Sequence, residues 1–343
     1  MGTRTRTIAL GATVGVLVVA LVLIIALTSR IAPGPSPDRS GLGGQSVSTA
    51  SAPSAEPPAT ASEPSPVPSA GPGATDGPVV VLVGAGDIAE CSEGADAATA
   101  DLVESVGGVV FTLGDNAYEN GTFAEFQDCY GPTWGQPSIK DRTMPVVGNH
   151  EYRTRGAEGY FRYFGAAAGD PDEGWYAYDA GAWRIYALNS NCGEVGGCGA
   201  GSAQARWLRE DLAANPRACV VAMWHHPRFS SGEHGNHPFM ADVWRTLQDA
   251  GAELVLAGHD HSYERFGPQD AAGLADERGL VELVVGTGGR DPRGFRDPLP
   301  NSLVRESPVF GVMRLVLGAD GYDFEFLATP GYDFSDRGSG TCH

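Results

Sequence analysis

The stretch VVVLVGAGDI, residues 79–88, decides how the rest of the chain is interpreted, because an apolar run ends there in a polar turn. Its β-branched residues predict a buried strand over residues 79–84. Apolar residues at helical spacing follow over residues 95–106, and a second buried strand is predicted over residues 109–113. This strand–helix–strand succession indicates a layered α/β fold.

Further elements extend the same pattern along the chain, and we expect about nine or ten strands with few long helices. Two hairpins are predicted, one turning at Ala180-Gly181 and one at Asp320-Gly321. Two packed sheets flanked by helices would accommodate these elements. The other predicted strands are 143–147, 175–179, 183–188, 219–224, 254–257, 280–285, 309–317 and 322–327, and the other predicted helices are 204–214 and 239–250.

The N-terminus carries a predicted membrane-targeting segment. Residues 1–7 contain Arg4 and Arg6, and residues 8–28 form an apolar stretch long enough to cross a bilayer as a helix. The basic flank predicts that residues 1–7 are cytoplasmic and that the remainder lies outside the cytoplasm. The alternative is a cleaved signal peptide. We therefore expect a single-pass protein of the cell membrane with an extracytoplasmic folded domain, or a secreted protein if the segment is cleaved.

Composition separates a linker from a folded domain. Residues 29–77 are rich in Pro, Ser, Ala and Gly, which predicts a disordered linker and leaves residues 78–343 as the folded domain. The formal net charge of the 343 residues is -19, so we expect no nucleic-acid-binding surface. Any anion-binding site in so acidic a protein must overcome this field locally, and bound cations are the simplest way to do so. The sequence does not indicate an oligomeric state.

The chain has six cysteines, and an even number in an exported domain predicts disulfides. Cys192 and Cys198 form the first predicted pair, because they flank a Gly-rich loop. The second predicted pair is Cys91 with Cys129, which leaves Cys219 with Cys342. A thiolate metal site is the alternative, but no two cysteines have the tight spacing typical of one.

Polar side chains follow five of the predicted strands. Each segment by itself is typical of a turn or a helix cap. Because ligands bind at the carboxyl ends of strands in open α/β sheets, we expect the five segments to converge on one site. They are GDI (86–88), GDNAY (114–118), GNHE (148–151), WHHP (224–227) and GHDHSYER (258–265).

The order and wording of these segments resemble the calcineurin-like metallophosphoesterase superfamily, and within it the purple acid phosphatase branch. The resemblance covers roughly residues 79–330. It is specific because Tyr118 stands where that branch has a tyrosinate, whereas Ala89 stands where most of the superfamily has a histidine ligand. The resemblance implies an α/β (α+β) fold, a four-layer metallophosphoesterase sandwich with two packed mixed β-sheets flanked by helices.

The resemblance also implies ligands for two linked metal ions. The histidine ligand of the family lies two residues before a proline, which selects His225 rather than His226. Hard anionic ligands favour Fe(III) in the first position, and imidazoles suit a divalent Fe, Zn or Mn ion in the second. The implied set is Asp87, Tyr118 and His261 for the first metal, Asn149, His225 and His259 for the second, and Asp115 bridging both.

The implied activity is metal-dependent hydrolysis of phosphate esters, as in acid phosphatases that act on monoesters. Histidines near the leaving group are candidate proton donors. His150 is the first candidate. The family pattern gives a second candidate, which is His234 by its spacing from the ligand His225 or His237 by the residues that follow it. A phosphodiesterase or nucleotidase on the same site is the alternative, because loops set substrate choice. A non-catalytic anchored surface protein is a further alternative.

Overall fold

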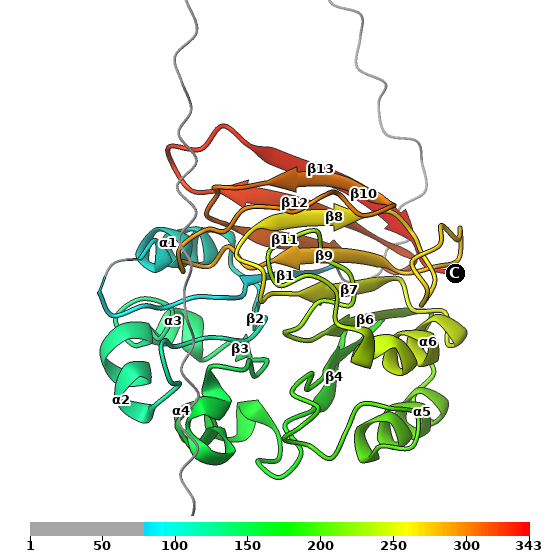
Figure 1. Ribbon diagram of the computed structural model, residues 1–343, viewed down its shortest axis with the longest axis horizontal. Coiled ribbons are helices and arrows are strands. Elements are labelled where there is room, and N and C mark those ends of the chain that lie inside the picture. Colours follow the sequence, from blue (N-terminus) through cyan, green and yellow to red (C-terminus); the bar gives the residue numbers. More distant parts are fainter. Residues whose placement is uncertain (1–78, 93) are drawn as a thin grey trace, which may run out of the picture. The chain divides into compact units, whose positions relative to one another are not determined.

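The computed structural model describes residues 79–92 and 94–343, in which two mixed β-sheets lie between helices (Figure 1). The six-stranded sheet has the order β13 (Ser335–Thr341), β12 (Gly321–Ala328), β11 (Gly311–Leu317), β1 (Val80–Ala85), β2 (Val109–Thr112) and β3 (Thr143–Met144). The seven-stranded sheet has the order β10 (Ser302–Glu306), β8 (Tyr263–Phe266), β9 (Val281–Val285), β7 (Leu254–Ala257), β6 (Cys219–Met223), β5 (Trp183–Ala187) and β4 (Tyr176–Ala180).

The helices flank the strands on two sides. Those of the described residues are α1 (Asp96–Val106), α2 (Phe123–Glu125), α3 (Pro137–Lys140), α4 (Glu158–Phe164), α5 (Ala203–Ala214) and α6 (Ala241–Asp249). In Figure 1, α1 to α4 lie on one side of the strands, and α5 and α6 lie on the other. Local sequence sets the ends: the Ser202 hydroxyl accepts a hydrogen bond from the Ala205 N–H at the start of α5, and Gly251 follows α6 with φ 75°.

Parallel pairing places several strand ends together. In the six-stranded sheet β1 is parallel to β2 and β2 to β3. In the seven-stranded sheet β5, β6, β7 and β9 are parallel neighbours. Adjacent parallel strands end at the same edge of a sheet, so the loops that follow β1, β2 and β3 lie together, as do those that follow β6 and β7.

The core explains why the central strands are apolar throughout. On β6, Val221 and Met223 join a buried cluster that includes Leu315 of the six-stranded sheet. Their neighbours Val220 and Ala222 belong to the cluster on the other face, which contains Trp244 of α6. A strand covered on both faces needs apolar residues at every position.

The predicted fold class is confirmed, because the structure has two mixed sheets flanked by helices. The predicted hairpins are β4–β5 and β11–β12. Three observed strands, β8, β10 and β13, were not predicted. The predicted strand 143–147 is shorter, because only Thr143–Met144 pairs with β2. The predicted helix 239–250 divides into a 3-10 turn, Pro238–Met240, and α6.

All six cysteines form disulfides with the predicted partners, and these bonds join Cys91 to Cys129, Cys192 to Cys198 and Cys219 to Cys342. The predicted cytoplasmic residues 1–7, membrane segment 8–28 and linker 29–77 lie outside the described residues. Within the described ranges, the structure has no helix that is both long and apolar enough to span a membrane.

Candidate metal centre

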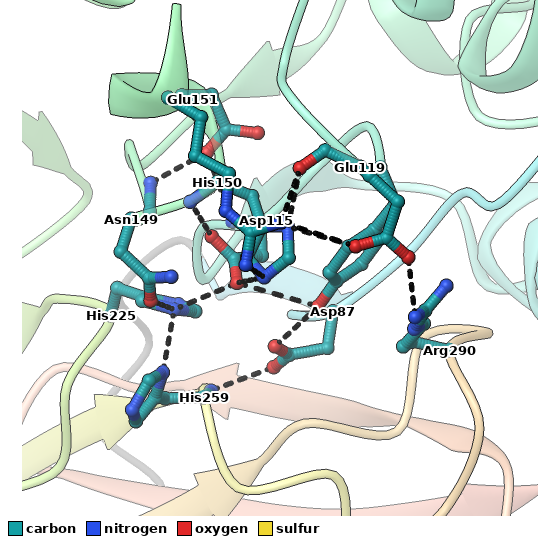
Figure 2. Close-up of polar contacts among 12 residues, drawn as sticks. Asp87, Asp115, Glu119, Asn149, His150, Glu151, His225, His259 and Arg290 are labelled. Carbon is teal, nitrogen blue, oxygen red and sulfur yellow. Dashed lines mark hydrogen bonds and ion pairs between the residues drawn. The ribbon is translucent and has the colours of Figure 1, made fainter.

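The seven predicted ligands meet where strands of both sheets end (Figure 2). Loops after β1, β2 and β3 bring four of them from the six-stranded sheet, and loops after β6 and β7 bring three from the seven-stranded sheet. The residues are Asp87 after β1, Asp115 and Tyr118 after β2, Asn149 after β3, His225 after β6, and His259 and His261 after β7.

The residues proposed by resemblance for the first metal form one group of contacts. The Tyr118 hydroxyl lies 2.9 Å from Asp87 Oδ1 and 3.3 Å from His261 Nε2. His261 Nε2 also lies 3.4 Å from Asp87 Oδ1. Asp115 Oδ2 completes the group at 3.4 Å from the Tyr118 hydroxyl. Three oxygens and one nitrogen therefore converge on one small volume.

The residues proposed for the second metal form an adjoining group around His225 Nε2. This atom lies 3.0 Å from Asn149 Oδ1 and 3.1 Å from His259 Nδ1. It also lies 3.2 Å from Asp115 Oδ2. The same carboxylate oxygen of Asp115 therefore belongs to both groups, which is the position expected of a ligand shared by two cations.

The hydrogen bonds of two histidines show that these groups suit a cation. His225 Nδ1 lies 2.7 Å from the Leu113 carbonyl, and His261 Nδ1 lies 2.8 Å from the Asp291 carbonyl. Each Nδ1 donates its hydrogen to a carbonyl, so each ring, in the neutral form that binds a metal, points the lone pair of Nε2 at other acceptor atoms. Buried acceptors that face one another need a proton or a cation between them, so the donor set fits metal binding.

The charge of the carboxylates shifts the pKa values of the ligands in the metal-free protein. Burial alone disfavours an imidazolium, but the charge and hydrogen bond of Asp115, the charge of Asp87 and the hydrogen bond to the Leu113 carbonyl together outweigh it and raise the pKa of His225 to about 9. Burial, together with the charges of Asp87 and Asp115, raises the pKa of Tyr118 well above its usual value. A tyrosinate at this position therefore requires positive charge close by, which a bound cation would supply.

The backbone at the site adopts conformations that need small neighbours. Asp87, Asp115 and His259 have positive φ values of 59°, 49° and 71°. A glycine precedes each of these three residues, and this pattern in the sequence indicates that the backbone packs closely there. Gly148 shows the need most clearly, because a Cβ atom there would lie 2.2 Å from the Asp115 nitrogen.

Glu151 connects two of the ligand loops. Its side chain is fully buried, and its two oxygens accept hydrogen bonds from four backbone N–H groups. Asp115 and Gly148 donate to Oε2 at 3.0 and 2.7 Å, and Asn116 and Ala117 donate to Oε1 at 2.7 and 3.3 Å. This carboxylate therefore fixes the loop of Asp115 against the loop of Asn149.

The three candidate proton donors surround the same groups. The His150 ring packs against the Tyr118 ring with centroids 4.4 Å apart, and its Nε2 lies 3.8 Å from Asp115 Oδ2. The rings of His234 and His237 lie 4.2 and 5.0 Å from the His259 ring. The structure thus brings both alternatives, His234 and His237, next to the second group.

Three other residues near the site, Ser190, His226 and Arg290, are not among the predicted ligands or proton donors. Ser190 Oγ lies 2.8 Å from His226 Nδ1, and the ligand atoms of His225, His226 and His259 lie within 4.8 Å of one another. Arg290 lies over the Tyr118 ring, 4.7 Å from its centroid, and pairs with Glu90 and Glu119 at 2.5 Å each. The carboxylates thus hold this guanidinium beside the predicted tyrosinate.

Comparison of the sequence with known proteins finds relatives of this chain. An uncharacterized protein of Mycobacterium tuberculosis is 30% identical over 43% of this chain and 35% of its own length. Purple acid phosphatase 18 of Arabidopsis thaliana is 30% identical over 32% of this chain and 27% of its own length. The chain thus spans about a third of the length of these curated relatives.

A solved structure supports the same fold. The purple acid phosphatase from yellow lupin (Lupinus luteus) seeds superposes with a TM-score of 0.68 at 18% identity, over 78% of this chain and 54% of that chain. Residues 80–263 match the family model of the calcineurin-like phosphoesterases, a range that contains all seven predicted ligands. The chain therefore belongs to the calcineurin-like phosphoesterase family.

Proposed function

We propose that the protein hydrolyses phosphate monoesters at a dinuclear metal centre, as an acid phosphatase does. The observation that carries this proposal is the position of Asp115 Oδ2, which contacts ligand atoms of both groups. Curated relatives named purple acid phosphatase and tartrate-resistant acid phosphatase support the choice of a monoester. The first group would hold Fe(III), and the second would hold divalent Fe, Zn or Mn.

The residues of the chain would prepare the site for hydrolysis. When bound, two cations lower the pKa of a water molecule and offset the negative charge of phosphate oxygens. Asp115 holds the two groups together, and Glu151 fixes the loop that carries it. As the bond between phosphorus and the ester oxygen breaks, that oxygen takes a proton. His150, His234 and His237 are the proposed donors, because they lie around the ligands without belonging to them.

We also propose that the domain works outside the cytoplasm, with residues 8–28 as its membrane anchor. Three disulfides support this placement, because such bonds persist in oxidising compartments. Immunoblotting of membrane and medium fractions, with protease added to intact cells, tests the proposal. Protection of the domain from protease would contradict it.

The direct test is hydrolysis of an aryl phosphate monoester and of the matching diester by the purified full-length chain. We expect turnover of the monoester, its loss after chelation and its return when metal is restored. A higher kcat/KM for the diester would instead identify a phosphodiesterase on the same site. No turnover of either ester, in protein that holds two metals per chain, would contradict the proposed activity.

The variant Tyr118→Phe tests whether Tyr118 is a ligand of Fe(III) at the first metal position, and the measurement is the visible absorption of the protein. A phenolate bound to Fe(III) absorbs visible light through charge transfer from the ring to the iron. We expect a visible band in the iron-loaded protein and its loss in Tyr118→Phe, whereas the control Tyr332→Phe keeps it. Absorption spectra at equal iron content measure the difference. An unchanged band in Tyr118→Phe would show that this residue is not the ligand.

A further inference from the structure

A pocket of about 410 Å³ adjoins the second group of ligands. Asn149, a predicted ligand, lines it together with His226, whose ring lies 4.4 Å from the ring of the predicted ligand His259. The volume is within the range of small-molecule binding sites. A phosphate held by the metal centre would therefore direct one of its ester substituents into this pocket.

One wall of the pocket presents an aromatic ring to solvent. Phe239 lines the pocket and is 41% exposed. Its ring lies 5.8 Å from the His226 ring and 5.1 Å from the His237 ring, which hold it in place. The exposed face of Phe239 is therefore available for stacking beside the metal centre.

Another part of the lining is held by hydrogen bonds and a disulfide. Tyr152 lines the pocket, and its hydroxyl accepts a hydrogen bond of 2.8 Å from Asn189 Nδ2. Gln204 bonds to the Asn189 backbone N–H at 2.6 Å and to its carbonyl at 2.9 Å. The disulfide between Cys192 and Cys198 closes the loop that follows. A wall held in this way loses little conformational freedom when a ligand binds.

The charges of the pocket disfavour a second phosphate group. Among its lining residues, all of which the structure describes, Arg153 is the one permanent cation. Arg153 already pairs with Glu119 at 3.2 Å, and Glu194 adds a negative charge to the same lining. The pocket therefore suits a neutral planar group better than an anionic one.

We propose that this pocket binds an aromatic ring of the leaving alcohol, and that Phe239 and Tyr152 set the preference for such esters. This inference rests on the proposed phosphomonoesterase activity and adds its substrate class. The aromatic group enters beside Asn149 and stacks on Phe239. Alkyl esters would use the same metal centre without this contact.

The test compares 1-naphthyl phosphate with glycerol 2-phosphate in the metal-loaded full-length protein. Aromatic stacking contributes enough that Phe239→Ala should lower kcat/KM for the naphthyl ester about five- to tenfold, and for the glycerol ester less than about twofold. Phe239→Trp should keep the naphthyl preference. The matched control Leu274→Ala removes an exposed side chain, 66% exposed, that is not among the residues lining this pocket, and should change neither value. Equal losses for both esters would overturn the inference.

A binding measurement separates this inference from the proposed activity. Phenylphosphonate and methylphosphonate are not hydrolysed, so calorimetry compares their affinities without turnover. We expect the wild-type protein to bind phenylphosphonate about five- to tenfold more tightly, and Phe239→Ala to bind the two equally. Equal binding by the wild type would overturn the pocket assignment. Phenyl preference without turnover of either ester would support the pocket and contradict the proposed activity.

Discussion

Asp115→Asn is expected to remove the activity and at least one metal ion per chain. The reason is geometric, because Asp115 Oδ2 lies 3.4 Å from the Tyr118 hydroxyl and 3.2 Å from His225 Nε2. An amide carries no negative charge and cannot offset two cations at once. We expect kcat to fall at least about a thousandfold, measured with an aryl phosphate at saturating concentration. Metal content by elemental analysis should fall in parallel.

The control for this variant is Asp101→Asn, which makes the same chemical change at an exposed position of α1. It should keep two metals and full activity. Circular dichroism then shows whether Asp115→Asn retains the fold. A folded Asp115→Asn protein with two metals and unchanged kcat would exclude Asp115 as the shared ligand.

The meeting of the candidate ligands was predictable because each polar segment lies in the loop after a predicted strand. The apolar run that ends at Ala85 is followed by Asp87, and the run that ends at Thr112 is followed by Asp115. Parallel pairing of β1 with β2 then brings the two loops together without any information from distant residues. Short apolar runs therefore predicted where the polar segments converge, whereas the choice of individual ligands came from the resemblance to the purple acid phosphatases.

Strands that depend on distant partners were not predictable in the same way. In β8, Glu264 and Arg265 interrupt the apolar pattern, but both are paired in the structure. Glu264 is buried and accepts hydrogen bonds from Ser231, and Arg265 pairs with Asp336 at 2.6 Å. These partners are 33 and 71 residues away along the chain. A local pattern cannot show that a charged residue will be satisfied inside a sheet.

The edge strand β13 gave no apolar signal at all. Its sequence, SDRGSGT, is polar, and the strand is held by backbone pairing with β12. Gly338 lies opposite Phe324, where a Cβ atom would approach the aromatic ring to 2.6 Å. The glycine allows the ring to lie across the edge strand. A glycine-rich polar segment is read as a loop unless its partner strand is known.

Glu151→Gln is expected to destabilise the fold and to weaken metal binding together. The glutamine would keep one acceptor oxygen, but its NH₂ group would face two of the four backbone N–H donors. Each buried N–H that loses its acceptor costs about 1–3 kcal/mol, so the loss of two should lower the free energy of unfolding by about 2–6 kcal/mol. Thermal and urea unfolding of the metal-free protein measure this change.

Measuring metal binding distinguishes a loss of ligand positioning from a general loss of stability. Glu151 holds the N–H groups of Asp115 and Gly148 on one oxygen, so its removal should separate the loops that carry Asp115 and Asn149. We expect weaker metal binding even at temperatures where the variant is fully folded, with partial recovery in Glu151→Asp. Glu158→Gln, at a side chain that is 67% exposed, is the control and should change neither quantity. A destabilised Glu151→Gln protein that binds both metals normally would show that Glu151 supports the fold without positioning the ligands.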